Sequence, residues 1–210
     1  MSEAQILATA ENVLLESRAG FLKERNQFLF SKDKLVASIL TSFPKIASVE
    51  IAREEDSLNI VIEERDTLGV WCKSGDCFYF DKNGVIFEQA PRSFGSLVIS
   101  IEDARDIEAN LGSAVLDKNQ VEFSSAVHGI IGRNFPFSSR TFFITKEAEY
   151  EILTSENWRL LLNKNEDSEY QLSNLKHLLD KEIQSRRGEL EYIDLRLGNK
   201  VYYKYRSENY

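Results

Sequence analysis

The chain has 210 residues, 42% of them hydrophobic, which is enough for one ordinary domain or two small ones with buried cores. Its 34 acidic residues outnumber the 26 basic ones, and the basic residues are scattered, so the sequence lacks the electrostatic footprint of a nucleic-acid-binding protein. It also lacks a signal-like opening and any apolar run near the roughly 18 to 20 residues of a membrane span, so we expect a soluble polypeptide.

The first part of the chain predicts the order helix, helix, strand, strand. Ser2 and Gln5 have the spacing of a capping box, and apolar residues then recur at helical intervals. Ser31 is a candidate N-cap for a second helix, which Pro44 ends. Alternating apolar and polar residues then predict two strands, at 49–51 and 58–62.

Beyond Arg65 the sequence changes to short strands and turns, so we expect a domain boundary there. Two more helices are predicted, one at 119–133 and one that begins at a capping box formed by Ser168 and Gln171. The mixture predicts an α+β fold. Besides a terminal hairpin, the expected strands lie at 68–72, 77–80, 85–87, 97–101, 140–145, 150–154 and 158–162.

The last part of the chain predicts a β-hairpin with its turn at Gly198 and Asn199, because Gly and Asn supply the positive φ that tight turns need. A strict two-residue loop would put the apolar residues of the two strands on opposite faces of the sheet. We therefore predict a longer, bulged turn in which Leu197 faces Val201. This register sets Asp194 opposite Lys204 and gathers one face from Ile193, Leu195, Leu197, Val201, Tyr203 and Tyr205.

No later strand follows this hairpin to cover its last strand. A terminal strand of this kind offers unpaired backbone donors and acceptors to a partner strand. Tyrosines are frequent here, and a tyrosine ring suits an interface because it is large and has a polar tip. Tyrosine is also common on strands in general, so the sequence leaves open whether this strand is a docking edge or simply the rim of a sheet.

Cys72 and Cys77 flank a short polar segment that contains Gly75, which suggests a hairpin with the two sulfur atoms at opposite positions. A disulfide would imply an oxidising compartment, whereas two reduced, half-buried thiols would suit the cytosol. Zinc is the weakest interpretation, since the histidines, His128 and His177, lie far away in helical patterns.

The sequence has no nucleophile elbow, phosphate-binding glycine loop, metal-binding histidine pair or dinucleotide fingerprint. We therefore expect a non-enzymatic protein with no cofactor, metal or small-molecule substrate. The rival from another class is a small hydrolase with carboxylate catalysis, which would need two inward-facing acids in one polar cleft.

Four segments carry a resemblance to a known family over nearly the whole chain, at 43–51, 57–65, 78–87 and 192–196. In their order and spacing, these four segments resemble segments of the bacterial cell-division family FtsQ/DivIB. The corresponding parts of that family are a helix-to-strand passage, a strand ending in a Glu-Arg pair, an Asp- and Gly-containing hairpin and a penultimate strand. One departure is Thr67, where that family usually has a proline soon after the Glu-Arg pair.

The resemblance implies a POTRA-like domain at 1–66, with two helices on a small sheet whose first strand is missing. It implies a β-domain at 67–210, whose mainly antiparallel sheet ends in an edge hairpin. The family members are non-enzymatic divisome scaffolds, anchored at the extracytoplasmic face of the cell membrane at the septum by one membrane helix, for which this sequence has no candidate. Their partners are FtsB/FtsL-like division proteins, with other divisome proteins as candidates at the POTRA domain.

In the family, the late helix and final strands of the β-domain bind FtsB by strand addition. By this resemblance, Arg196 occupies the position of a basic interface residue of the family, and Leu197 occupies the position of a neighbouring contact residue. The resemblance also favours the disulfide over reduced thiols. The runner-up is a POTRA-bearing component of polypeptide transport or outer-membrane assembly, although such proteins usually carry tandem POTRA units or many barrel strands. The turn and edge strand that would receive the partner comprise Gly198, Asn199, Val201, Tyr202 and Tyr203.

Overall fold

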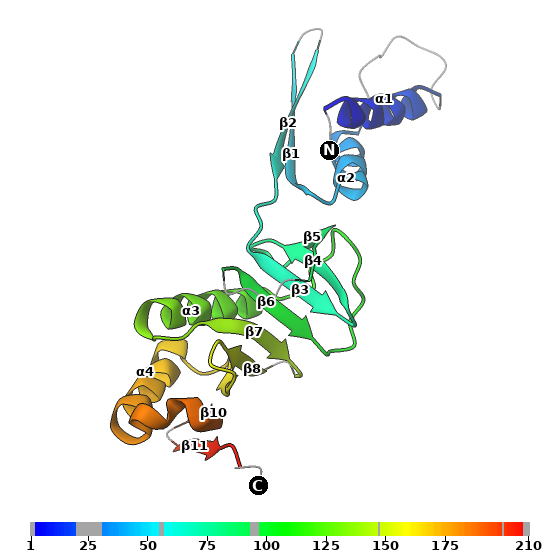
Figure 1. Cartoon of the computed structure of the whole chain (residues 1–210). Helices are drawn as coiled ribbons and strands as arrows, with labels where there is room; N and C mark the ends of the chain where they lie inside the picture. The colour runs from blue at the N-terminus through cyan, green and yellow to red at the C-terminus, as the bar shows by residue number, and fades with distance from the viewer. Residues whose placement is uncertain are drawn as a thin grey trace. The chain divides into compact units, whose positions relative to one another are not determined.

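The computed structural model describes residues 3–19, 31–54, 57–92, 97–146, 148–198 and 200–207, and only the backbone of residues 3, 14–19 and 53 (Figure 1). Its described part is a mixed α+β structure with a large, mainly antiparallel sheet that ends in a terminal hairpin. The chain divides into two compact units. The first comprises Met1–Asp66 and Asn110–Ser113, and the second comprises Thr67–Ala109 and Ala114–Tyr210.

The first unit contains two helices and a two-stranded antiparallel sheet, in the predicted order. Ser31 is the N-cap of the second helix, as predicted, because its hydroxyl accepts a hydrogen bond from the Lys34 N–H at 3.3 Å. The Ser2 half of the first predicted cap lies outside the described residues. The apolar faces of both helices and one face of the sheet form the core of this unit. The elements are α1 Glu3–Ala19, α2 Lys32–Ser42, β1 Ile46–Arg53 and β2 Leu58–Glu64.

The second unit contains a nine-stranded sheet in the order β11-β10-β9-β8-β7-β6-β3-β4-β5. Most neighbours are antiparallel, and the pairs β3–β6, β6–β7 and β9–β10 are parallel. Its strands are β3 Gly69–Lys73, β4 Asp76–Phe80, β5 Ile86–Gln89, β6 Ile99–Asp103, β7 Ser139–Ile144, β8 Glu149–Thr154, β9 Arg159–Asn163, β10 Leu190–Leu197 and β11 Lys200–Tyr205.

Two helices, α3 Lys118–Asn134 and α4 Ser168–Leu178, pack on this sheet and enclose the main core. The core has this position because alternate residues of each strand point to the same face, where they meet the apolar sides of the helices. Trp71 and Trp158 are among its largest fully buried side chains. After α4 the chain continues as a π-helical turn, η1 Leu179–Ile183, and a 3₁₀ segment, η2 Gln184–Glu189, before β10 begins.

The predicted cap of the last helix is wrong by one residue. The side chain of Asp167 accepts the N–H of Tyr170 at 2.7 Å, so Asp167 and not Ser168 is the N-cap of α4. Gln171 does not reach back to the cap but bonds the backbone of Asn163 in both directions. The signal was ambiguous because Asp and Ser are about equally good N-caps and stand side by side.

Cys72 and Cys77 are joined by a disulfide that links directly opposite positions of β3 and β4. The turn between the strands consists of Ser74 and Gly75, which both have positive φ, as a two-residue hairpin requires. Both cysteines are buried, and with Val70 they belong to a small apolar cluster separate from the main core. The disulfide therefore fixes the β3–β4 register from within a packed cluster.

Candidate partner-binding edge

β11 is the edge strand of the nine-stranded sheet, as the sequence predicts (Figure 1). Among the described residues its one strand neighbour is β10, with which it forms an antiparallel hairpin. The opposite edge is β5, a strand of four residues that includes the buried Ile86 and Phe87. Of the two edges, β11 is the longer and has the more exposed side chains.

The predicted register of the terminal hairpin is wrong, although its assignment of faces is largely right. Leu197 pairs with Lys200 across a two-residue turn, and Asp194 pairs with Tyr202 rather than Lys204. A bulge in β10 between Asp194 and Leu197 supplies the extra residue that the sequence predicts in the turn. The bulge restores the alternation of faces, so Ile193 lies opposite Tyr203, on the predicted face, rather than opposite Tyr205 as the predicted register requires.

The backbone of β11 presents alternate residues to β10 and to the free side. The Arg206 N–H donates to the Glu189 carbonyl at 2.8 Å, so the hydrogen-bonding groups of Arg206 point toward β10. Hydrogen-bonded positions alternate along an antiparallel strand, so the even-numbered residues of β11 direct their backbone groups toward β10, as Arg206 does. Lys200, which closes the turn opposite Leu197, is also even-numbered and fits this alternation. The backbone N–H and C=O groups on the free side therefore belong to Val201, Tyr203 and Tyr205.

The side chains of these same three residues lie on the face of the sheet that carries α4. Val201 and Tyr205 pack against the main core, and the ring of Tyr203 meets that of Tyr205 edge-on at 5.6 Å between centroids. The intervening side chains, including Tyr202, point to the opposite face. Tyr202 and Tyr203 are 49% and 38% exposed, so the edge carries an exposed ring on each face.

A groove of about 310 Å³ lies between β11 and the helical segment that precedes the hairpin. Val201 and Tyr203 form one wall, and the other wall comes from α4 and η1. Leu178 provides an apolar surface there, and polar groups surround it. A strand paired with β11 would direct alternate side chains toward this groove. The residues of the helical wall are Asn174, His177, Leu178 and Glu182.

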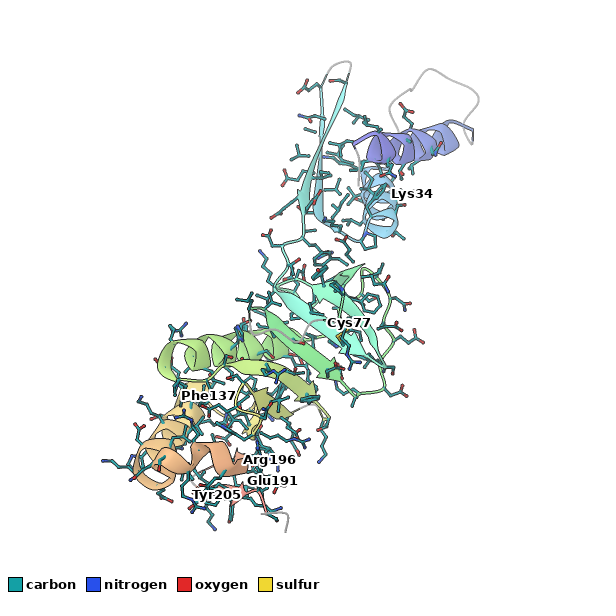
Figure 2. All side chains as sticks on the ribbon, viewed as in Figure 1. Lys34, Cys77, Phe137, Glu191, Arg196 and Tyr205 are labelled. Carbon is teal, nitrogen blue, oxygen red and sulfur yellow. A yellow bond between two sulfur atoms is a disulfide. The ribbon has the colours of Figure 1, made fainter. Side chains whose placement is uncertain are left out.

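Arg196 is held by carboxylates of its own chain. The guanidinium of Arg196, which Figure 2 labels, donates to both oxygens of Asp194, at 2.9 and 2.7 Å, and to Glu149 at 2.5 Å. Burial raises the pKa of Asp194, but hydrogen bonds from the Arg196 side chain and backbone outweigh it and leave the pKa below its ordinary value. The positive charge predicted at this edge is therefore present but already paired.

The other predicted site residues surround the hairpin turn. Leu197 is 57% exposed, so it does not pack with Ile193 and Leu195, the residues with which the predicted register groups it. Gly198 has φ of 64°, which explains the preference for glycine at this position. Asn199 lies outside the described residues. The resemblance implies that the late helix takes part in binding, but none of its residues was predicted, because nothing in the spacing of α4 indicates which of its sides faces β11.

A second, more open cavity of about 450 Å³ lies beside the first turns of α3 and α4. Glu122 and Glu166 both line it, which is the pairing that a carboxylate hydrolase would need. Both side chains are exposed, however, and Glu122 pairs with the more exposed Lys118 at 3.6 Å. In the described part of the chain, no group of three or more His, Cys, Asp or Glu side chains is placed to hold a metal ion.

No protein-family model and no curated protein matches this chain.

Proposed function

We propose that this protein is a non-enzymatic scaffold of bacterial cell division, which binds an FtsB/FtsL-like partner by strand addition at β11. The observation that carries the proposal is the edge position of β11, with the N–H and C=O groups of Val201, Tyr203 and Tyr205 directed away from β10. Backbone pairing would supply the affinity, and the groove beside Tyr203 would receive side chains of the partner strand.

The first unit supports the same proposal. Its two helices cover one face of a small antiparallel sheet, which is the arrangement expected for a POTRA-like domain that lacks one strand. We propose that Met1–Asp66 corresponds to that domain, and that the larger unit, which begins at Thr67, corresponds to the β-domain.

The proposed location is the extracytoplasmic face of the cell membrane at the septum. The buried Cys72–Cys77 disulfide supports an oxidising compartment, because disulfides form and persist outside the cytoplasm. Within the described residues, no helix has the length and hydrophobicity to cross a bilayer.

A capture experiment at a single position tests the docking strand. Tyr203→Pro removes an outward N–H and leaves the β10 side of β11 unchanged, as proline at an edge position can. Tyr203→Val removes the same ring but keeps the N–H and the strand preference, so it is the matched control. We expect an immobilised FtsB-like segment to retain the valine variant and to lose the proline variant.

Circular dichroism and thermal unfolding of both variants must match the parent protein, so that loss of capture reports the edge and not the fold. Equal capture of the proline variant and the parent protein would refute docking at β11.

A further inference from the structure

The free edge of β11 carries a row of cations on the face opposite α4. Lys200, Lys204 and Arg206 alternate along the chain, so their side chains share one face with Tyr202 between the two lysines. Glu191 pairs with Lys204 at 2.8 Å. Lys200 has no carboxylate partner in the part of the chain that the structure describes, and the Arg206 side chain donates to a backbone carbonyl. Asp194 lies opposite Tyr202 on this face, but its carboxylate is already paired with Arg196. In the described part of the chain, Glu191 is thus the one carboxylate paired with any of these three cations, on a protein whose net charge is −8.

These cations oppose pairing between two copies of β11. Because the outward backbone groups belong to odd-numbered residues, two antiparallel copies would pair odd with odd and even with even positions. With Val201 opposite Tyr203 of a second copy, Lys200 lies opposite the second Lys204. With Tyr203 opposite itself, Lys200 lies opposite Arg206. Both registers place cation against cation, and like charges directly opposite destabilise a strand pair.

The same cations favour a foreign strand that carries carboxylates. A partner strand would place alternate side chains opposite Lys200, Tyr202 and Lys204, and the intervening ones beside the groove at Val201 and Tyr203. Opposite-charge pairs directly across strands are stabilising, and an exposed ring between them suits any apolar side chain. The groove face, with Leu178 and Tyr203, suits apolar or aromatic side chains.

We propose that β11 selects a partner strand in which acidic residues alternate with apolar or aromatic residues, and that its edge lysines exclude a second copy of this chain. The inference rests on the proposed docking function of β11 and adds the chemistry of the strand that docks. It runs against the overall charge of −8, which would favour a basic partner. A preference for an acidic strand would therefore come from the residues of the β11 edge and not from attraction between the net charges of the two partners.

Two short synthetic peptides with blocked ends test the selection, one with alternating Glu and Val and one with alternating Lys and Val. We expect fluorescence anisotropy to show about tenfold tighter binding of the Glu peptide, from two cross-strand charge pairs, and a smaller preference at high salt. The double variant Lys200→Glu with Lys204→Glu should reverse the preference. Equal affinities, or preference of the parent protein for the Lys peptide, would overturn the proposal.

Tyr203→Pro separates this inference from the proposed function. If proline abolishes binding of both peptides while the parent protein binds them equally, docking at β11 stands and charge selection is wrong. If proline leaves peptide binding unchanged, the docking edge itself is wrong, and the selection is wrong with it.

Self-association tests the exclusion of a second copy. In the Lys200→Glu variant, the new carboxylate would face Lys204 of a second copy twice in one symmetric pair, so we expect a dimer in sedimentation velocity where the parent protein is monomeric. Lys118→Glu changes the charge equally at a site on α3 that is 82% exposed, and should stay monomeric. A parent protein that dimerises, or a Lys200→Glu variant that does not, would contradict the exclusion.

Discussion

Arg196 and Asp194 form a two-pronged ion pair, with Nε to Oδ1 at 2.9 Å and Nη2 to Oδ2 at 2.7 Å, although they are only two residues apart. The bulge in β10 lies between Asp194 and Leu197, at the position where the Arg196 side chain folds back onto Asp194. Glu149 accepts from the same guanidinium, so a partner carboxylate would have to compete with two internal ones.

Substitutions in this ion pair should change capture of an acidic partner in opposite directions. Arg196→Ala leaves Asp194 and Glu149 without their shared guanidinium, so we expect roughly fivefold weaker capture of the FtsB-like segment. Asp194→Asn removes one internal competitor and should strengthen capture several-fold. Surface plasmon resonance of both variants checks this. Changes in the same direction would mean that Arg196 acts only within its own chain.

The buried contact between Trp71 and Asp103 should be a main determinant of stability. Asp103 Oδ2 accepts the Trp71 indole N–H at 2.9 Å, and both Asp103 oxygens accept from the Arg105 guanidinium. Asp103→Asn leaves the largely buried guanidinium of Arg105 without its carboxylate and with little access to water, so we expect the free energy of unfolding to fall by about 3 kcal/mol. Urea unfolding measures the loss. Glu102→Gln, which breaks the exposed pair with Arg92, should cost less than about 1 kcal/mol.

Stability should fall in acid because of these carboxylates. Burial raises the pKa of Asp103, but hydrogen bonds from Arg105 and Trp71 outweigh it, so the folded pKa lies below the ordinary value. A depressed folded pKa stabilises the protein above the unfolded pKa, and this stabilisation is lost as pH falls through the folded pKa. We expect the free energy of unfolding to decline below about pH 5, and less steeply in Asp103→Asn. Equal slopes would exclude Asp103 as a contributor.

Loss of the disulfide should destabilise the second unit without changing its fold. The Cys72–Cys77 bridge closes a short loop, so Cys72→Ser with Cys77→Ser should lower the free energy of unfolding by about 2 kcal/mol. Because both cysteines are nearly inaccessible, at 1% and 3% exposure, thiol labelling under reducing conditions should need prior unfolding. Rapid labelling of the native, reductant-treated protein would contradict this packing.

Relief of backbone strain at the end of η1 should stabilise the protein. Gln184 has φ of 48° and ψ of −119°, a combination that residues with a Cβ rarely adopt. Gln184→Gly should raise the free energy of unfolding by about 1 kcal/mol, despite loss of the side-chain bond to the Lys181 carbonyl. Gln184→Ala loses the same bond but keeps the strain, so it should give no gain. Stabilisation by both variants would mean that the Gln184 side chain, and not the strain, is the cause.

Local patterns in the sequence predicted features that depend on neighbouring residues. The Ser31 cap, the opposition of Cys72 and Cys77 and the edge position of the last strand all follow from short-range spacing and turn chemistry. The Asp167 cap and the bulge after Asp194 were not predicted, because the sequence permits an alternative equally well in each case. The alternatives are a cap at the adjacent Ser168 and an extra residue in the hairpin turn.

By itself, the sequence determined the α+β class, the kinds of elements in chain order and a terminal hairpin with a free strand. Only the tertiary structure decided that β3 lies between β4 and β6, that α4 and η1 form a wall beside Tyr203, and that Arg196 is already paired with Glu149. The reason is physical: hydrophobic periodicity and turn preferences are set within a few residues, whereas strand order, groove walls and ion pairs between distant residues depend on packing of the whole unit.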